Sequence, residues 1–171
     1  KWFDHAYGIR YVALRYFNAA GAWPGGELGV DRENETLLIP VTLETANGKR
    51  DELLVFGDDY DTKDGSGVRD YIHVYDLASA HYLALKYLEE GNKSDIFNLG
   101  NGTGQSVLEV IDTASQVVGF KINSRIVERR PGDPSLVIAS SDKAIEKLKW
   151  KPERNDLKDI ISDARAFMKK Y

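Results

Sequence analysis

The chain has 171 residues, of which 42% are hydrophobic and 29% are charged, and its formal net charge is −4. This length fits one domain whose core buries roughly 70% of the surface of the unfolded chain. No apolar run is long enough to span a membrane, and the net negative charge argues against a nucleic-acid-binding surface. We therefore expect neither a membrane nor a nucleic acid as a partner. The sequence contains no cysteine, which excludes disulfides and thiolate metal sites and is typical of a cytoplasmic protein.

The first predicted elements are the end of a helix and a strand. Residues 1–7 are typical of the tail of a helix, and the β-branched and aromatic residues 9–17 predict a buried strand that ends in a turn at Asn18. The chain begins at Lys1 without a methionine or a signal peptide, so we expect it to be a piece of a longer chain.

After an irregular loop at 23–35, helices and short strands alternate. Thr36 is the expected N-cap of the first complete helix, and Ser106 with Glu109 forms a capping-box pattern before another helix. The predicted helices cover residues 36–46, 76–90, 106–118, 142–150 and 157–168, and the predicted strands cover 53–56, 95–99 and 122–127. This alternation predicts an α/β fold.

The stretch from Phe56 to Asp76 carries the most informative chemistry. Its glycines allow a tight loop, after which Arg69 stands on a short predicted stem at 68–74. A guanidinium held in this way suits a phosphate or a carboxylate, because its planar fork donates two parallel hydrogen bonds. The alternative is a surface loop whose arginine pairs with Asp70. A second arginine-bearing turn covers 128–134.

No complete catalytic set follows from composition and spacing. The turn with Gly100, Gly102 and Gly104 lies between a predicted strand and a predicted helix, but its spacing differs from that of a dinucleotide fingerprint, which favours a structural turn. The three histidines are scattered without the spacing of metal ligands, so we predict no metal site, and we interpret His73 as a packing and hydrogen-bonding residue.

Six motifs, in the same order along the chain, resemble those of the UDP-glucose 4-epimerases, which are extended short-chain dehydrogenase/reductases. They are L-R-Y-F-N with A-A-G-A from Leu14, L-I-P at 38–40, V-F-G-D-D-Y at 55–60, D-G-S-G-V-R-D-Y-I-H-V at 64–74, F-N-L-G-N-G-T-G-Q-S-V-L-E-V at 97–110 and R-R-P-G-D-P at 129–134. The resemblance implies the C-terminal part of an NAD(P)-binding Rossmann-type enzyme, mainly its smaller substrate-binding domain.

The resemblance also implies how the chain is divided. Residues 1–18 would be a remnant of the Rossmann domain, and 19–171 would be the UDP-sugar-binding domain, with segments at about 76–119 packing back on the Rossmann domain. The apolar strand at 9–17 would be buried on both faces in the complete sheet. The segment alone would expose that surface, so we expect it to self-associate.

In this family, NAD accepts and returns a hydride at C4 of the sugar, which interconverts UDP-glucose and UDP-galactose in galactose metabolism. The resemblance places the NAD-binding glycine turn and the catalytic Tyr-x-x-x-Lys pair upstream, so we expect no catalytic residue in this chain and no activity of the chain alone. NAD would be bound mainly by that N-terminal half, with Phe17 and Ala19 near the nicotinamide. Homodimers are common among relatives, and we regard one as an open expectation.

The remaining implied roles concern UDP. Arg69 and Arg130 match the arginines that grip the diphosphate, and Asp133 matches a carboxylate on the ribose hydroxyls. Phe56 matches the aromatic residue beside the uracil, although a plain core position is the alternative. Contacts from Asn18 to the phosphate or sugar, and from the backbone at Leu38 and Leu54, complete the implied set.

Two positions depart from or vary within the family pattern. Leu37 stands where many members have Asn or His, so one polar contact would be lost. The small side chain of Val137 would leave room for a 2-N-acetyl group, which predicts that UDP-N-acetylhexosamines are also accepted. The sequence is also compatible with a UDP-uronate or UDP-pentose epimerase, with a sugar-nucleotide dehydratase and with a stand-alone nucleotide-sugar-binding module.

Overall fold

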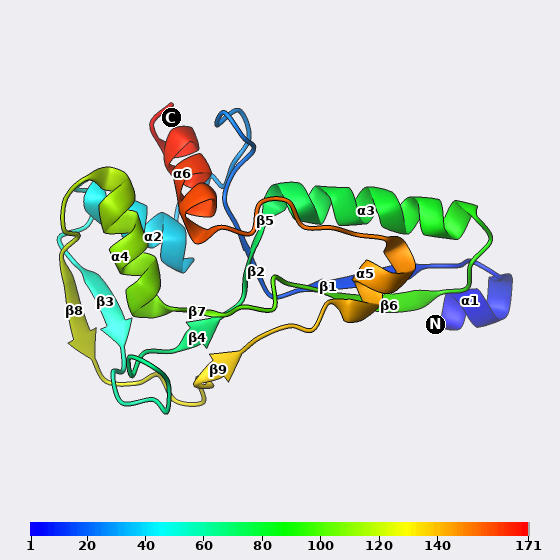
Figure 1. The fold of residues 1–171 in the computed structure, drawn as a ribbon, viewed down its shortest axis with the longest axis horizontal. Coiled ribbons are helices and arrows are strands. Elements are labelled where there is room, and N and C mark those ends of the chain that lie inside the picture. The colour runs from blue at the N-terminus through cyan, green and yellow to red at the C-terminus, as the bar shows by residue number, and fades with distance from the viewer. Residues whose placement is uncertain (171) are drawn as a thin grey trace.

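The computed structural model describes residues 1–170 and has the predicted α/β alternation, arranged in an elongated molecule (Figure 1). The helices are α1 (Trp2–Tyr7), α2 (Leu38–Ala46), α3 (Val74–Glu89), α4 (Val107–Val118), α5 (Asp142–Leu148) and α6 (Leu157–Met168). The strands are β1 (Val12–Tyr16), β2 (Asn18–Ala20), β3 (Leu53–Phe56), β4 (Val68–Arg69), β5 (Tyr71–His73), β6 (Asp95–Leu99), β7 (Gln105–Ser106), β8 (Ser124–Val127) and β9 (Leu136–Val137).

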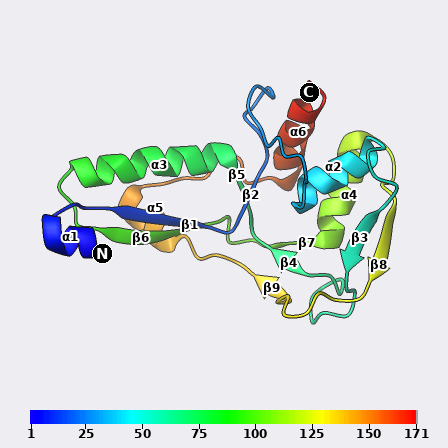
Figure 2. The same ribbon diagram turned by 180° about the vertical axis from the view of Figure 1, so that it is seen from behind.

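One end of the molecule is built on the parallel pair β1 and β6, in which Leu14 lies opposite Phe97. Helices α3 and α5 pack beside this pair, and α1 lies at the same end (Figures 1 and 2). Phe97, Leu99 and Trp150 are fully buried in the core that these elements share. Burial of such large side chains is the main favourable term that holds this end together.

The other end is a layer of three helices, α2, α4 and α6, packed against the parallel pair β3 and β8 (Figure 2). Its core contains Leu43, Val55, Val110 and Ile161. Helix α4, which lies within the predicted 76–119 segment, packs in this core. Helix α3 and strand β6, from the same segment, pack at the β1 end.

Short strands connect the two ends. β2 pairs in parallel with β5, and β4 lies between β7, which is antiparallel to it, and β9, which is parallel to it. These pairings place β2, which begins with Asn18, and β4, which ends with Arg69, between the two ends of the molecule (Figure 1).

Several predicted boundaries differ from the structure. The strand expected at 9–17 is the shorter β1, at 12–16, and the turn expected from Asn18 is instead the strand β2, which pairs with β5 while β1 pairs with β6. The side chains of β1 are half-buried or exposed. Helix α5 ends at Leu148, before the left-handed Lys149, so Trp150 lies outside it. Over residues 1–170, no helix is both long and apolar enough to cross a membrane.

Candidate functional site

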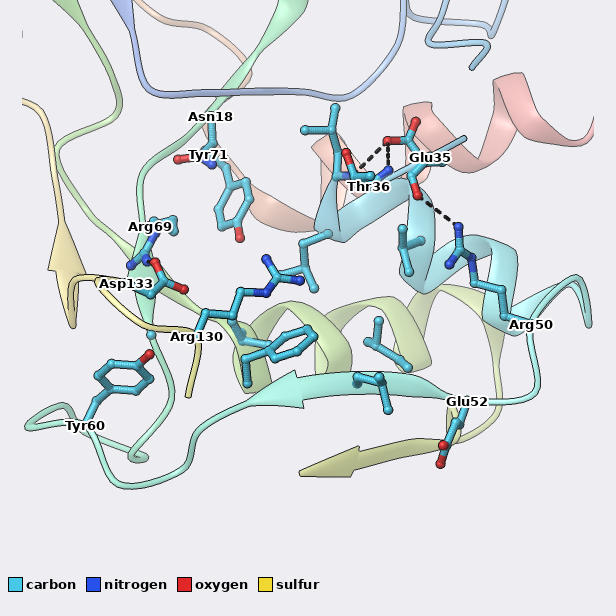
Figure 3. Close-up of a pocket in the computed structure, with 18 residues that line it drawn as sticks. Asn18, Glu35, Thr36, Arg50, Glu52, Tyr60, Arg69, Tyr71, Arg130 and Asp133 are labelled. Carbon is cyan, nitrogen blue, oxygen red and sulfur yellow. Dashed lines mark hydrogen bonds and ion pairs between the residues drawn. The ribbon is translucent and has the colours of Figure 1, made fainter. Parts of the chain in front are cut away.

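A pocket of about 530 Å³ opens where α2, β3 and β4 meet the turn that carries Arg130 and Asp133 (Figure 3). Seven of the eight residues predicted to bind substrate line it. These are Asn18, Leu38, Leu54, Phe56, Arg69, Arg130 and Asp133. Segments far apart in the sequence thus form one site.

Arg69 lies at one side of the pocket and pairs with Asp133 through Nη2. Its Nη1 donates a hydrogen bond to the carbonyl of Val68 at 2.8 Å, which fixes the guanidinium close to its own strand. The side chain is largely enclosed, so its charge is screened less by solvent than that of a surface arginine. The alternative, in which Arg69 pairs with Asp70, is wrong.

Asp70 is buried and accepts hydrogen bonds from backbone N–H groups instead. Its carboxylate accepts from Asn101 at 2.7 Å, from Gly102 at 3.0 Å and from Ala139 at 3.1 Å. Gly100 makes room for it, because a Cβ there would lie 2.5 Å from Asp70 Oδ2. The glycine turn after β6 is therefore a structural turn, as predicted.

Arg130 points into the middle of the pocket (Figure 3). Its guanidinium carbon lies 3.8 Å from the centroid of the Phe56 ring, close enough for a cation–π contact. Phe56 is half-buried at the end of β3, so its ring is available to the pocket as well as to packing. A planar aromatic face beside two arginines and a carboxylate can hold a flat base together with a phosphate group.

Glu35 and Arg50 lie on the opposite side of the pocket (Figure 3), and the sequence reasoning did not single them out. Glu35 Oε1 accepts from the backbone N–H groups of Thr36 and Leu37, both at 2.7 Å, and Arg50 Nη2 donates to the Glu35 carbonyl at 2.9 Å. The N-cap of α2 is Leu37, and no side-chain cap bond from Thr36 is present in the structure described. The sequence does contain a signal for Glu35: it is an acidic residue just ahead of the helix, where the helix dipole favours negative charge.

Two tyrosines also line the pocket and were not predicted. The Tyr71 hydroxyl points into it (Figure 3), and burial raises the pKa of Tyr71 to about 12, with nearby Arg69 opposing the shift. Tyr71 therefore stays protonated and can donate a hydrogen bond. Tyr60 lies on the loop between β3 and β4, and only 7% of it is exposed.

Three predicted residues are not among those that line this pocket. Val137 is half-buried on β9, in register with Arg69 of β4. Phe17 and Ala19 are exposed where β1 passes into β2. The carboxyl end of a strand is where open α/β sheets bind ligands, so both side chains are available to a neighbouring group.

His73 has the structural role that we predicted. It is fully buried, its Nδ1 accepts from the Tyr75 backbone N–H at 3.0 Å, and its Nε2 lies 3.1 Å from Asp163 Oδ2. Burial lowers the pKa of His73, and the hydrogen bond to Asp163 opposes that shift. Within residues 1–170, no group of three or more His, Cys, Asp or Glu side chains is arranged to hold a metal ion.

Comparison with known proteins places the site in context. A family model described as the NAD dependent epimerase/dehydratase family matches residues 1–100. UDP-glucose 4-epimerase of Streptococcus mutans serotype c is 52% identical over 171 residues, which are 100% of this chain and 51% of the relative. The chain thus spans about half the length of the curated relatives that it matches.

The fold is similar to those of solved UDP-glucose 4-epimerase structures. A crystal structure of UDP-glucose 4-epimerase matches with a TM-score of 0.96 and 48% identity, over 99% of this chain and 51% of that one. The UDP-glucose 4-epimerase of Bifidobacterium longum, solved in complex with NAD+ and UDP, matches with a TM-score of 0.90 and 39% identity, over 99% of this chain and 50% of that one.

Proposed function

Because the chain belongs to the NAD dependent epimerase/dehydratase family, we propose that it forms the UDP-sugar-binding part of a UDP-glucose 4-epimerase. The complete enzyme would interconvert UDP-glucose and UDP-galactose by reversible oxidation at C4 of the sugar. The chain alone would be inactive, because the catalytic tyrosine and lysine are expected upstream of it. Galactose metabolism, a cytoplasmic location and a homodimer stay predictions from the resemblance.

One observation carries this proposal: a single pocket brings together two arginines, a carboxylate and a half-buried aromatic ring. Arg69 and Arg130 would hold the diphosphate, with charge-assisted hydrogen bonds of about 1.5–3 kcal/mol each. Phe56 would pack against the uracil. Asp133, which only accepts hydrogen bonds when ionised, would accept from the ribose hydroxyls.

Binding of UDP would require both arginines to exchange partners. In the structure, Arg69 pairs with Asp133 and Arg130 lies over Phe56. A diphosphate offers each guanidinium a doubly charged, bidentate partner, which favours the exchange. Asn18, Leu38 and Leu54, which line the same pocket, would supply the amide and backbone contacts.

NAD is the implied cofactor, and the residues of this chain that fit it are few. The exposed Phe17 and Ala19, between β1 and β2, would face the nicotinamide. When bound, NAD supplies a hydride acceptor and donor for C4 of the sugar. The described residues would contribute by holding UDP firmly, so that the sugar can turn between its two faces.

Val137 leads us to propose a wider substrate range. A small side chain beside the Arg69 strand would leave space for a 2-N-acetyl group. The complete enzyme would then accept UDP-N-acetylglucosamine as well as UDP-glucose.

The first test measures UDP, UMP and uridine binding by calorimetry, with the complete polypeptide that carries these residues. We expect Arg69→Ala and Arg130→Ala each to weaken UDP binding by about tenfold or more and to reduce the preference for UDP over UMP. Arg10→Ala is the matched control, because Arg10 is exposed and donates to the Asn92 carbonyl at the β1 end of the molecule, away from the pocket. An unchanged preference for UDP in Arg69→Ala would contradict the diphosphate assignment.

The second test is turnover of UDP-glucose and of UDP-N-acetylglucosamine by the complete polypeptide. Turnover of UDP-glucose distinguishes an epimerase from a stand-alone binding module. If the polypeptide turns over UDP-glucose but not UDP-N-acetylglucosamine, the proposal about Val137 is wrong and the proposed epimerase function stands.

A further inference from the structure

Tyr60 has a polar group that nothing in the described structure satisfies. Its hydroxyl oxygen is buried and, within residues 1–170, has no hydrogen-bond partner. A buried hydroxyl without a partner costs free energy, so native proteins rarely keep one. A hydroxyl of this kind in the wall of a binding pocket indicates a partner that is gained in another state of the site.

The position of the phenol is fixed by its surroundings. The Arg129 guanidinium lies 4.0 Å from the centroid of the Tyr60 ring, and the Tyr60 N–H donates to the Gly65 carbonyl at 2.9 Å. Gly65 has a φ of +79°, and a Cβ there would lie 1.9 Å from the Asp58 carbonyl oxygen. Only glycine fits at that point of the loop, so the ring is held against the turn that carries Asp133.

Figure 3 shows the Tyr60 hydroxyl directed toward the Arg69–Asp133 ion pair. Asp133 accepts from Arg69 in the structure. A phosphate competes for the same guanidinium, and when Arg69 turns to it, the Asp133 carboxylate loses its charged partner. A half-buried carboxylate that loses its charged donor is less stable, even where ribose hydroxyls donate to it, and a phenolic O–H can donate in place of Arg69.

We propose that Tyr60 is a positioning residue that takes the place of Arg69 at Asp133 when a nucleoside diphosphate binds. The Tyr60 hydroxyl donates to the Asp133 carboxylate, which holds that carboxylate in place for the ribose, while Arg69 binds the diphosphate. The phenol keeps its proton throughout, and only hydrogen bonds are exchanged. This inference rests on the proposed function, because it requires a nucleoside diphosphate as the ligand.

The test uses Tyr60→Phe in the complete polypeptide, which keeps the ring and its contact with Arg129. We expect UDP to bind about tenfold more weakly, as for the loss of one hydrogen bond to a charged group. Uridine binding should change less than about twofold, because without a phosphate Arg69 stays on Asp133. The midpoint temperature of thermal unfolding of the ligand-free protein should not fall, since the variant removes a hydroxyl that has no hydrogen-bond partner.

An Asp133→Ala background shows whether Tyr60 acts through Asp133. There, Tyr60→Phe should no longer weaken UDP binding, because the acceptor is gone. Tyr87→Phe is the matched control, since Tyr87 is half-buried in the core at the β1 end of the molecule, where its ring packs on Phe97. It should leave UDP binding unchanged.

The outcomes separate the two proposals. If wild-type protein binds UDP and Tyr60→Phe binds it equally well, the inference is wrong and the proposed function stands. A tenfold loss that persists in the Asp133→Ala background would mean direct contact with the ligand and would also overturn it. Equal losses with uridine and UDP would point to a merely structural effect and contradict it. If the wild-type protein does not bind UDP, the proposed function fails first.

Discussion

Asp70 shows how one side chain holds the site together. It lies between Arg69 and Tyr71, both of which line the pocket, and its carboxylate accepts three backbone N–H groups from two distant loops. Those loops follow β6 and β9, so the carboxylate connects the strand that carries Arg69 to the segment after β6 and to the segment between β9 and α5. A buried carboxylate satisfied by amides in this way is a structural group, and its neighbours carry the binding chemistry.

We therefore expect Asp70→Ala to lower the free energy of unfolding by about 3 kcal/mol, because three buried N–H groups lose their acceptor. Urea denaturation measures this loss. Asp58→Ala is the control, since Asp58 is exposed on the loop between β3 and β4, and its effect should stay within about 0.5 kcal/mol. A loss below about 1 kcal/mol in Asp70→Ala would mean that water replaces the carboxylate at these amides.

Helix α3 depends on a side chain that can titrate. His73 is its N-cap and accepts from the Tyr75 N–H through Nδ1, so its Nε2 carries the proton and donates to Asp163. Arg154 donates to the same carboxylate at 2.8 Å, and Asp76 also faces the imidazole. Protonation of Nδ1 would remove the cap acceptor at the start of a 16-residue helix.

This arrangement predicts how stability depends on pH. Burial lowers the pKa of His73 in the folded protein below the ordinary value of 6.5, while the hydrogen bond to Asp163 opposes the shift. The unfolded chain thus binds more protons below that pH, and the free energy of unfolding falls as the pH falls through it. Between pH 6.5 and 5.5 this one group removes at most about 1.4 kcal/mol.

Denaturation at pH 7.5 and 5.5 measures the effect, with His73→Asn as the comparison, because asparagine caps a helix without titrating. We expect the variant to lose less stability between the two pH values than the wild type. Identical losses would show that His73 does not contribute to the pH dependence. His81→Asn serves as a further control, because His81 lies on the exposed side of the same helix.

The elements that sequence reasoning predicted correctly are those set by neighbouring residues. The capping box of α4 is present because Ser106 and Glu109 are three residues apart and need no other partner. Helix α2 begins two residues later than predicted, because the N–H groups of Thr36 and Leu37 donate to the Glu35 carboxylate ahead of the helix and Leu37 is the N-cap. Strand β2 was missed, and a turn was predicted in its place, because the strand depends on pairing with the distant β5.

At the scale of the whole molecule, the site also divides into features that short motifs predict and features that depend on contacts between distant residues. Family motifs predicted Arg69, Arg130, Phe56 and Asp133, and these residues do line one pocket. Their mutual contacts were not predictable, because the Arg69–Asp133 pair joins residues 64 positions apart. Tyr60 ends the V-F-G-D-D-Y motif at 55–60, but only the fold shows that its hydroxyl is buried without a hydrogen-bond partner within residues 1–170.

The end of the molecule built on β1 presents an apolar surface. Its exposed side chains come from α1, from the residue after β1 and from α3. They are Trp2, Phe3, Tyr7, Phe17, Tyr82 and Leu85. Trp2 is 84% exposed and the Phe3 and Tyr7 rings lie 5.8 Å apart, and exposed large apolar side chains of this kind are typical of a surface that other protein covers.

We predict that the 171-residue segment on its own self-associates more than the complete polypeptide that carries it. Light scattering at several protein concentrations should give an apparent mass that rises with concentration. Replacing Trp2 by Lys and Phe3 by Glu should reduce this rise, because both changes place charge on the apolar surface. Leu28→Lys is the matched control, since Leu28 is also exposed but lies on the loop between β2 and α2. A constant mass at all concentrations would contradict the prediction, and an equal effect of Leu28→Lys would assign the association to a different surface.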